Sequence, residues 1–117
     1  MTNVEKRIVF IKLLGSLFCF ARLNGIDFII TAFYRSPEEQ KKLYDKGLTA
    51  CDGTLKKSNH QRWLAIDIAI IKDGAPNFNR IEEYETLGNY WKSIGGTWGG
   101  DWSSLNDIFH FEYNPGE

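Results

Sequence analysis

Hydrophobic residues in the first part of the chain recur with the period of a helix. Positions 10, 13, 14, 17, 18, 20 and 21 follow this period, which predicts a helix over residues 3–23 that ends at Asn24 and Gly25. Lys12 interrupts the apolar run, Glu5 precedes it, and the cleavage pattern of a secretory signal is missing. We therefore expect a helix that packs on the core, in a protein made in the cytoplasm without a signal peptide.

The rest of the chain alternates between strand and helix patterns. Runs rich in β-branched and aromatic residues predict strands, and runs with helical periodicity predict helices. We expect a strand over 26–34, a helix from Ser36 to Gly47, a polar loop over 48–59, a strand over 64–71, a loop over 72–77, a helix over 80–93, an aromatic and glycine-rich segment over 97–102 and a strand over 108–113. This order predicts an α+β fold: one compact domain over residues 1–117, with a small, mainly antiparallel sheet and about three helices.

Composition narrows the classes of function. The chain has 117 residues, 43% of them hydrophobic, so it can bury a core without disulfides. Its formal net charge of −1 argues against a nucleic-acid partner, and no run is apolar enough to cross a membrane. Cys19 and Cys51 form no paired-cysteine motif. We expect a monomer.

Asp67 is the one charged residue in the strand expected over 64–71. Side chains alternate along a strand, so the leucine and isoleucines share one face, while Asp67 lies on the other face between two alanines. A buried carboxylate is costly unless it is paired or binds a metal. From this strand alone two interpretations stay open: a solvent-facing acid, or a metal ligand in the hollow beside the alanines.

Both histidines lie close to expected strands. His60 comes just before the strand of Asp67, and His110 shares a strand face with Glu112, opposite a bulky aromatic face. Two imidazoles and one carboxylate form a zinc set that leaves a fourth position for water. Because a lone histidine is usually an ordinary core or surface residue, this interpretation depends on the joint pattern.

Four ordered motifs carry a resemblance to a known family. SNHQRWLAID matches the form Ser-x-His-x-x-Gly-x-Ala-x-Asp except at one position, and DIFHFE contains the form Asp/Glu-x-x-His. TAFYRSPEEQKKLYDKG lies upstream, and WGGDW precedes the last motif. Over residues 26–113 the chain resembles the zinc D-alanyl-D-alanine carboxypeptidases, which include the L-alanyl-D-glutamate endopeptidases of bacteriophage lysins. Four motifs in order are far more specific than one.

The resemblance implies a role for several positions. It makes three residues the ligands of one zinc ion per chain: His60, Asp67 and His110. It makes Asp107 the general base, which takes a proton from the water that zinc activates. It places Arg35 where substrate or the developing oxyanion is held, and Ser58 beside the first ligand, where we expect it to bind substrate.

One position departs from the family pattern. The glycine three residues after the first histidine is Trp63 in this chain. A glycine there indicates a special backbone angle or a close approach. Tryptophan is tolerated if the backbone stays in an ordinary region; it can also narrow the cleft or supply an aromatic wall. We count Trp63 among the substrate-binding residues.

Some assignments have competing interpretations. Glu112 could be the base in place of Asp107, which could be a turn residue, and Arg35 could pair with Glu38 or Glu39. Cys51 could be a fourth ligand of a structural zinc. Of Trp98 and Trp102, we expect one in the core and one in the cleft wall.

The resemblance implies a zinc peptidase that cuts peptidoglycan stem peptides. The preferred function is an L-alanyl-D-glutamate endopeptidase of phage or prophage origin, which reaches the cell wall after release. The alternatives are a D-alanyl-D-alanine carboxypeptidase and a non-catalytic zinc-binding module of the same fold.

Overall fold

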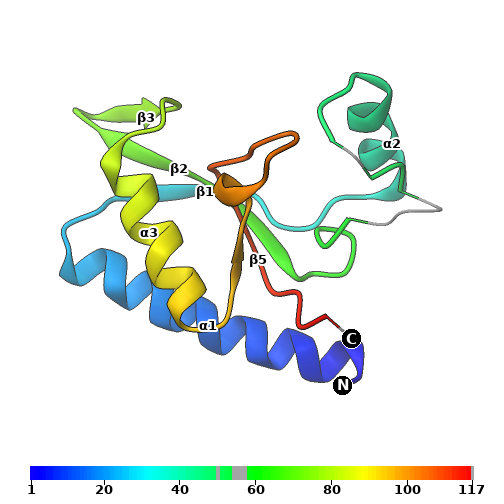
Figure 1. Cartoon of the computed structure of the whole chain (residues 1–117), viewed down its shortest axis with the longest axis horizontal. Helices are drawn as coiled ribbons and strands as arrows, with labels where there is room; N and C mark the ends of the chain where they lie inside the picture. The colour runs from blue at the N-terminus through cyan, green and yellow to red at the C-terminus, as the bar shows by residue number, and fades with distance from the viewer. Residues whose placement is uncertain (50, 54–57, 117) are drawn as a thin grey trace.

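The computed structural model describes residues 1–49, 51–53 and 58–116, and its architecture is the expected α+β type. Three helices accompany a small antiparallel sheet (Figure 1). The elements in chain order are α1 (Asn3–Leu23), β1 (Phe28–Ala32), α2 (Pro37–Asp45), β2 (Ala65–Lys72), β3 (Ala75–Asn77), α3 (Glu82–Ser93), β4 (Thr97–Trp98), the 3₁₀ turn η1 (Gly99–Asp101) and β5 (His110–Glu112).

The α1 helix has the bounds that the sequence predicts, because both of its signals are local. Thr2 and Glu5 form a capping box, in which the side chain of each accepts from the backbone N–H of the other. Gly25 follows the helix with φ of 65°, a left-handed conformation that suits glycine. No helix in the described ranges is long and apolar enough to cross a membrane.

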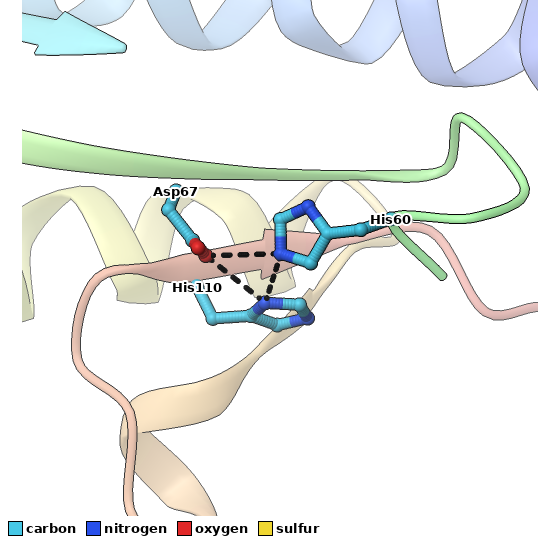
Figure 2. Close-up of side chains that lie close together, drawn as sticks. All are labelled: His60, Asp67 and His110. Atoms are coloured by element: carbon cyan, nitrogen blue, oxygen red, sulfur yellow. Dashed lines mark hydrogen bonds and ion pairs between the residues drawn. The ribbon is translucent and has the colours of Figure 1, made fainter. Parts of the chain in front are cut away.

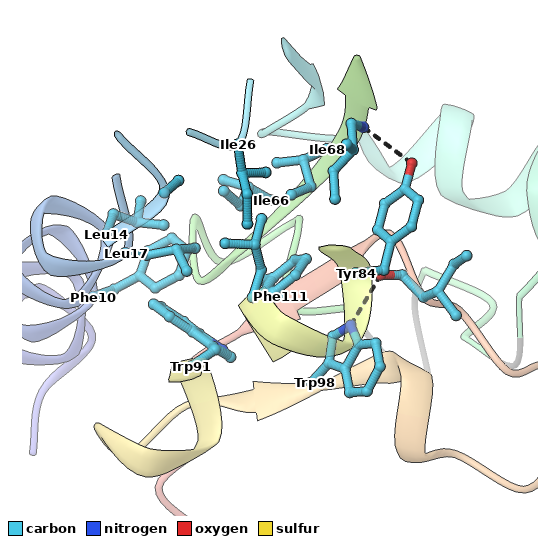
Figure 3. Close-up of a cluster of buried hydrophobic side chains, with 14 of the residues drawn as sticks. Phe10, Leu14, Leu17, Ile26, Ile66, Ile68, Tyr84, Trp91, Trp98 and Phe111 are labelled. Atoms are coloured by element: carbon cyan, nitrogen blue, oxygen red, sulfur yellow. Dashed lines mark hydrogen bonds between the residues drawn. The ribbon is translucent and has the colours of Figure 1, made fainter. Parts of the chain in front are cut away.

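The β2 strand is the centre of the sheet. It pairs antiparallel with β1 on one side, and on the other side with β5 near its start and with β3 near its end. The strand order is β1-β2-β5-β4. Three of its isoleucines, Ile66, Ile68 and Ile70, face α1 and α3. Phe10 of α1, Trp91 of α3 and Phe111 of β5 belong to the same cluster (Figure 3). All of these side chains are buried, so they form one core on this face of the sheet.

Three strand predictions need correction. The first strand is shorter than 26–34, because its pairing with β2 shifts in register between Ile30 and Ala32 and the chain then leaves the sheet. The last strand is shorter than 108–113, because Asp107 begins a turn in which its carbonyl accepts from the backbone N–H of His110 at 3.2 Å. The segment over 75–77 is the strand β3, and its proline lies on the edge of the sheet, where no ladder donor is needed.

Tyr84 of α3 joins the helix to two strands through its buried hydroxyl. The backbone N–H of Ile70 donates to Tyr84 Oη at 3.0 Å, and the hydroxyl donates to the carbonyl of Asn77. The side chain is fully buried, so no water can replace these bonds. This contact fixes α3 over the far end of β2, away from the histidines.

We expect Tyr84→Phe to destabilise the protein by about 1–3 kcal/mol, because it leaves a buried donor and a buried acceptor without their partner. Urea denaturation followed by circular dichroism would measure the change. Tyr44→Phe is the matched control, since Tyr44 is exposed. Equal unfolding midpoints for Tyr84→Phe and the wild type would contradict this account.

Candidate metal centre and its cavity

Three donor atoms from separate parts of the sequence meet at one point beside the sheet. His60 Nε2, Asp67 Oδ1 and His110 Nδ1 are each 3.2 Å from the other two (Figure 2). In a tetrahedral zinc site with bonds near 2 Å, neighbouring ligand atoms lie about 3.3 Å apart. The donor set and its spacing therefore fit a zinc ion with one position left for another ligand.

Strand pairing places two of the three donors. Asp67 of β2 is the register partner of His110 of β5, so the two side chains leave neighbouring strands on the same face. The third donor, His60, lies in the turn that leads into β2. Leu64 N–H donates to the Asn59 carbonyl at 2.8 Å in this turn, and Arg35 N–H donates to the His60 carbonyl at 3.4 Å. These bonds hold the turn against the end of β1.

In the neutral forms that can bind a metal, the two imidazoles have opposite tautomers, and a bound cation would replace the hydrogen bonds that they otherwise make to Asp67. His60 Nδ1 is 2.9 Å from the carbonyl of Phe33, which can only accept, so the ring proton lies on Nδ1 and Nε2 keeps its lone pair. His110 Nε2 is 2.7 Å from Glu112 Oε1, which places its proton on Nε2 and leaves Nδ1 available. Both lone pairs point toward Asp67 (Figure 2).

The electrostatics of the triad match a site for a cation. Burial acts to raise the pKa of Asp67, but hydrogen bonds from His110 and His60 outweigh it and hold this pKa well below its usual range. Burial acts to lower the pKa of His110, but Asp67 and Glu112 raise it to about 9. The raised pKa of His110 reflects the negative charge of the two carboxylates beside it, which favours positive charge at this point. The lowered pKa of Asp67 reflects the stabilisation of its ionised form by the two imidazoles.

A cavity of about 750 Å³ opens onto the triad. Arg35, Ser58, Trp102, Asp107 and Glu112 are among its lining residues. Ser58 Oγ is buried and has no hydrogen-bond partner within the described ranges, so it is available to a bound molecule. The structure thus brings six of the seven sequence-predicted site residues to one cavity: Arg35, Ser58, His60, Asp67, Asp107 and His110.

Asp107 lies in the turn that leads into β5. Its backbone N–H donates to the Gly99 carbonyl at 3.0 Å, and its Oδ1 accepts from the backbone N–H of Phe109 at 3.1 Å. A Cβ at Gly99 would lie 2.4 Å from the Asp107 carbonyl oxygen, so the close approach of the two segments requires glycine there. Burial, followed by the negative charge of Asp67, raises the pKa of Asp107 above its usual value.

Glu112, the competing candidate for the base, is bound on both oxygens. Oε1 lies against His110, and Oε2 accepts from Asn59 Nδ2 at 2.8 Å. The side chain is 7% exposed. This arrangement favours Asp107 over Glu112 for proton transfer to a bound molecule, because the Glu112 oxygens are already engaged.

Arg35 is held between two residues of the cavity region. Its Nη1 donates to Gln40 Oε1 at 2.8 Å, and its Nη2 lies 3.4 Å from Asp67 Oδ2. Gln40 is fully buried in α2 and donates in turn to the carbonyl of Cys51 at 2.8 Å. Sequence reasoning missed Gln40; the available signal was a polar residue four positions after the N-cap Ser36, on the inner face of the short helix.

Trp63 differs from what its sequence position suggested. Its φ is 62°, in the left-handed region that glycine favours, so the tryptophan has the special backbone angle that a glycine at this position of the family pattern indicates. The indole stacks on Tyr34, with ring centroids 4.6 Å apart and planes at 19°, and the Arg7 guanidinium lies 5.4 Å from its centroid. Trp63 is 40% exposed and is not among the residues that line the cavity.

The two remaining tryptophans divide as the sequence suggested, and the structure identifies which is which. Trp98 is buried, and its indole N–H donates to the carbonyl of Ile108 at 2.9 Å. Trp102 lines the cavity with its ring centroid 5.0 Å from that of His110. Cys51 also lines the cavity, but within the described ranges the one cluster able to hold a metal is made of the two histidines and Asp67.

Comparison with known proteins identifies similar chains. A family model described as D-alanyl-D-alanine carboxypeptidase matches residues 52–113. The peptidoglycan L-alanyl-D-glutamate endopeptidase CwlK of Bacillus subtilis (strain 168) is 34% identical over 106 residues, an alignment that covers 79% of this chain and 64% of that enzyme. This chain thus spans less than two thirds of the length of CwlK.

Two solved structures share the fold. The L-Ala D-Glu endopeptidase ChiX of Serratia marcescens has a TM-score of 0.62 at 20% identity, covering 76% of this chain and 68% of its own. A mutant of the vancomycin resistance D,D-pentapeptidase VanY from the VanB-type cassette, in complex with Zn(II), has a TM-score of 0.65 at 23% identity, covering 91% and 71%. At these identities the likeness is one of fold.

We expect purified protein to hold about one zinc per chain, because three protein ligands and one further ligand complete a tetrahedral site. His60→Ala and Asp67→Ala should each lose most of this metal, and inductively coupled plasma mass spectrometry after gel filtration would measure it. Cys51→Ser is the control and should keep the metal. Full zinc content in His60→Ala, or its loss in Cys51→Ser, would show that the ligand set is different.

Proposed function

Because the chain belongs to the D-alanyl-D-alanine carboxypeptidase family, we propose that it is a zinc metallopeptidase that hydrolyses a peptide bond in peptidoglycan stem peptides. The observation that carries this proposal is the equal-sided triangle of His60, Asp67 and His110 donor atoms at the wall of a cavity that Arg35 and Asp107 also line. Zinc held by these residues supplies a Lewis acid for the peptide carbonyl and lowers the pKa of water.

The residues around the triangle supply the rest of the chemistry. Asp107 takes a proton from the attacking water and passes it to the leaving amine, a role that needs a carboxylate at the cavity wall. Arg35, fixed by Gln40, presents a guanidinium to the developing oxyanion or to a substrate carboxylate. Ser58 offers a buried hydroxyl to the same substrate.

The bond that we propose is the one between L-alanine and D-glutamate. The similarity to CwlK, which is 34% identical over 106 residues, supports this choice. The alternative is a D-alanyl-D-alanine carboxypeptidase, which the description of the matching family model favours. A non-catalytic zinc module would need neither Asp107 nor Arg35 at the cavity, and both line it. The phage or prophage origin, release to the cell wall and monomeric state stay predictions.

Mass spectrometry of digested peptidoglycan tests the proposal. Purified muropeptides with intact pentapeptide stems would be incubated with the zinc-loaded protein and their products separated. The endopeptidase releases a peptide that begins with D-glutamate and leaves L-alanine on the muramyl group. The carboxypeptidase instead releases free D-alanine and shortens the stem by one residue. If neither kind of product forms, the proposal is refuted.

We expect Asp107→Asn to keep zinc but lose activity by about 10²–10⁴-fold, the usual contribution of general-base catalysis, because an amide cannot take the proton. The initial rate of muropeptide cleavage, with zinc content measured on the same sample, would check this. Asp101→Asn is the matched control, since Asp101 is exposed and pairs with Lys92. Near wild-type activity in Asp107→Asn would remove Asp107 from the mechanism.

A further inference from the structure

A hydrogen-bonded pair of side chains lies behind His110, on the side away from the other two donors. Glu112 Oε1 is 2.7 Å from His110 Nε2, and Glu112 Oε2 accepts from Asn59 Nδ2 at 2.8 Å. We propose that Asn59 and Glu112 are positioning residues that set the tautomer and orientation of His110 and so strengthen metal binding. This inference rests on the proposed function in taking that metal to be zinc.

The first step is the position of the His110 proton. An ionised carboxylate only accepts hydrogen bonds, so the neutral imidazole that faces Glu112 carries its proton on Nε2. The lone pair then lies on Nδ1, the atom that is 3.2 Å from both Asp67 Oδ1 and His60 Nε2. Without Glu112, either ring nitrogen could carry the proton, and one of the two forms has no lone pair for a metal.

The second step is the position of Glu112 itself. A glutamate side chain has three rotatable bonds, and burial alone does not fix its carboxylate. Asn59 supplies a neutral donor to the second oxygen, which holds the carboxylate without cancelling its charge. Asn59 is anchored by its backbone carbonyl, which accepts from Leu64 N–H at 2.8 Å. Ala65 is the register partner of Glu112, and its small side chain leaves room for Asn59 to reach across.

The third step is that the two histidines are supported differently. His60 donates to a neutral backbone carbonyl, whereas His110 donates to a carboxylate, which raises the basicity of its ring. The partly buried carboxylate of Asp67 and the buried carboxylate of Glu112 together supply two negative charges, which match a divalent cation. Loss of Glu112 should therefore weaken metal binding through its effect on His110 alone. The tautomer and orientation of His60 should not change.

Zinc affinity tests the proposal without reference to activity. Competition with a chromophoric chelator would give the zinc dissociation constant of the wild type and of Glu112→Ala, Glu112→Gln, Asn59→Ala and the double variant. Removal of such a partner typically costs about 10–100-fold in affinity, which is the loss expected for Glu112→Ala. The zinc affinity of Glu112→Gln should lie between those of the wild type and Glu112→Ala, since the amide oxygen can still accept the hydrogen bond from His110. Asn59→Ala should weaken zinc binding on its own and add little in the Glu112→Ala background, because Asn59 acts through Glu112.

Nitrogen-15 NMR of the imidazoles reports which ring nitrogen carries the proton. If Glu112 had a purely structural role, its replacement would not change this signal. The chain has two histidines, so each ring can be assigned and one serves as the control for the other. In the zinc-loaded wild type we expect the proton on Nδ1 of His60 and on Nε2 of His110. Glu112→Ala should change the His110 signals and leave those of His60. Glu85→Gln, an exposed carboxylate paired with Arg80, should change neither ring.

The outcomes separate this inference from the proposed function. If Glu112→Ala and Glu112→Gln lower the melting temperature of the protein but keep wild-type zinc affinity and the wild-type His110 signals, Glu112 is only a packing residue and the inference is overturned. Cleavage of peptidoglycan by the wild type would still stand in that case. If the variants lose zinc affinity as expected while the wild type cleaves no stem peptide, the positioning pair stands and the proposed function fails.

Discussion

The register between β2 and β5 is the constraint on which the candidate site depends. It pairs Asp67 with His110 on one face of the sheet and Ile66 with Phe111 on the other. A slip by one residue would turn every side chain of β5 to the opposite face. Ile66 and Phe111 are fully buried beneath α1 and α3, so the apolar core prevents that slip. The hydrophobic side of the sheet thus fixes the geometry of the polar side.

The remaining members of the site lie on connections, which are held by hydrogen bonds instead of a core. His60 and Arg35 lie in separate segments that bind each other: the His60 ring donates to the Phe33 carbonyl, and the His60 carbonyl accepts from Arg35 N–H. Gln40 then ties the Arg35 side chain to the loop at Cys51. The sheet thus supplies two donors from paired strands, and the connections supply the other residues of the site, a common division in enzymes.

Sequence patterns predicted the parts of the fold whose signals are local. The bounds of α1 follow from its periodicity and from a capping box between Thr2 and Glu5, and both signals lie in the helix or next to it in the sequence. The strand β3 was missed because a proline-containing segment indicates a loop unless its pairing partner is known. The final strand was predicted too long because the turn at Asp107 delays its start, and this turn is also held by a bond from Asp107 N–H to the Gly99 carbonyl, eight positions upstream.

The same distinction applies to the site. Motif spacing was enough to name His60, Asp67 and His110, which the structure brings together. It was not enough for Gln40, whose partners come from both sides of α2, or for Asn59, whose partner Glu112 is 53 positions away. It also gave no means to know that Trp63 keeps a glycine-like backbone angle. Each of these three features depends on contacts between separate segments of the chain. The residues around each position do not indicate these contacts.

The left-handed Trp63 links the turn that carries His60 to the first helix. A bulky residue at this φ costs on the order of 1–3 kcal/mol and persists only where surrounding contacts enforce it. Those contacts are the Tyr34 ring and the guanidinium of Arg7, which belongs to α1. Trp63 N–H donates to the His60 carbonyl at 3.4 Å, so the same turn carries both the strain and a donor residue. A contact from α1 thus reaches the turn that carries His60, so the packing of the first helix bears on the shape of the metal centre.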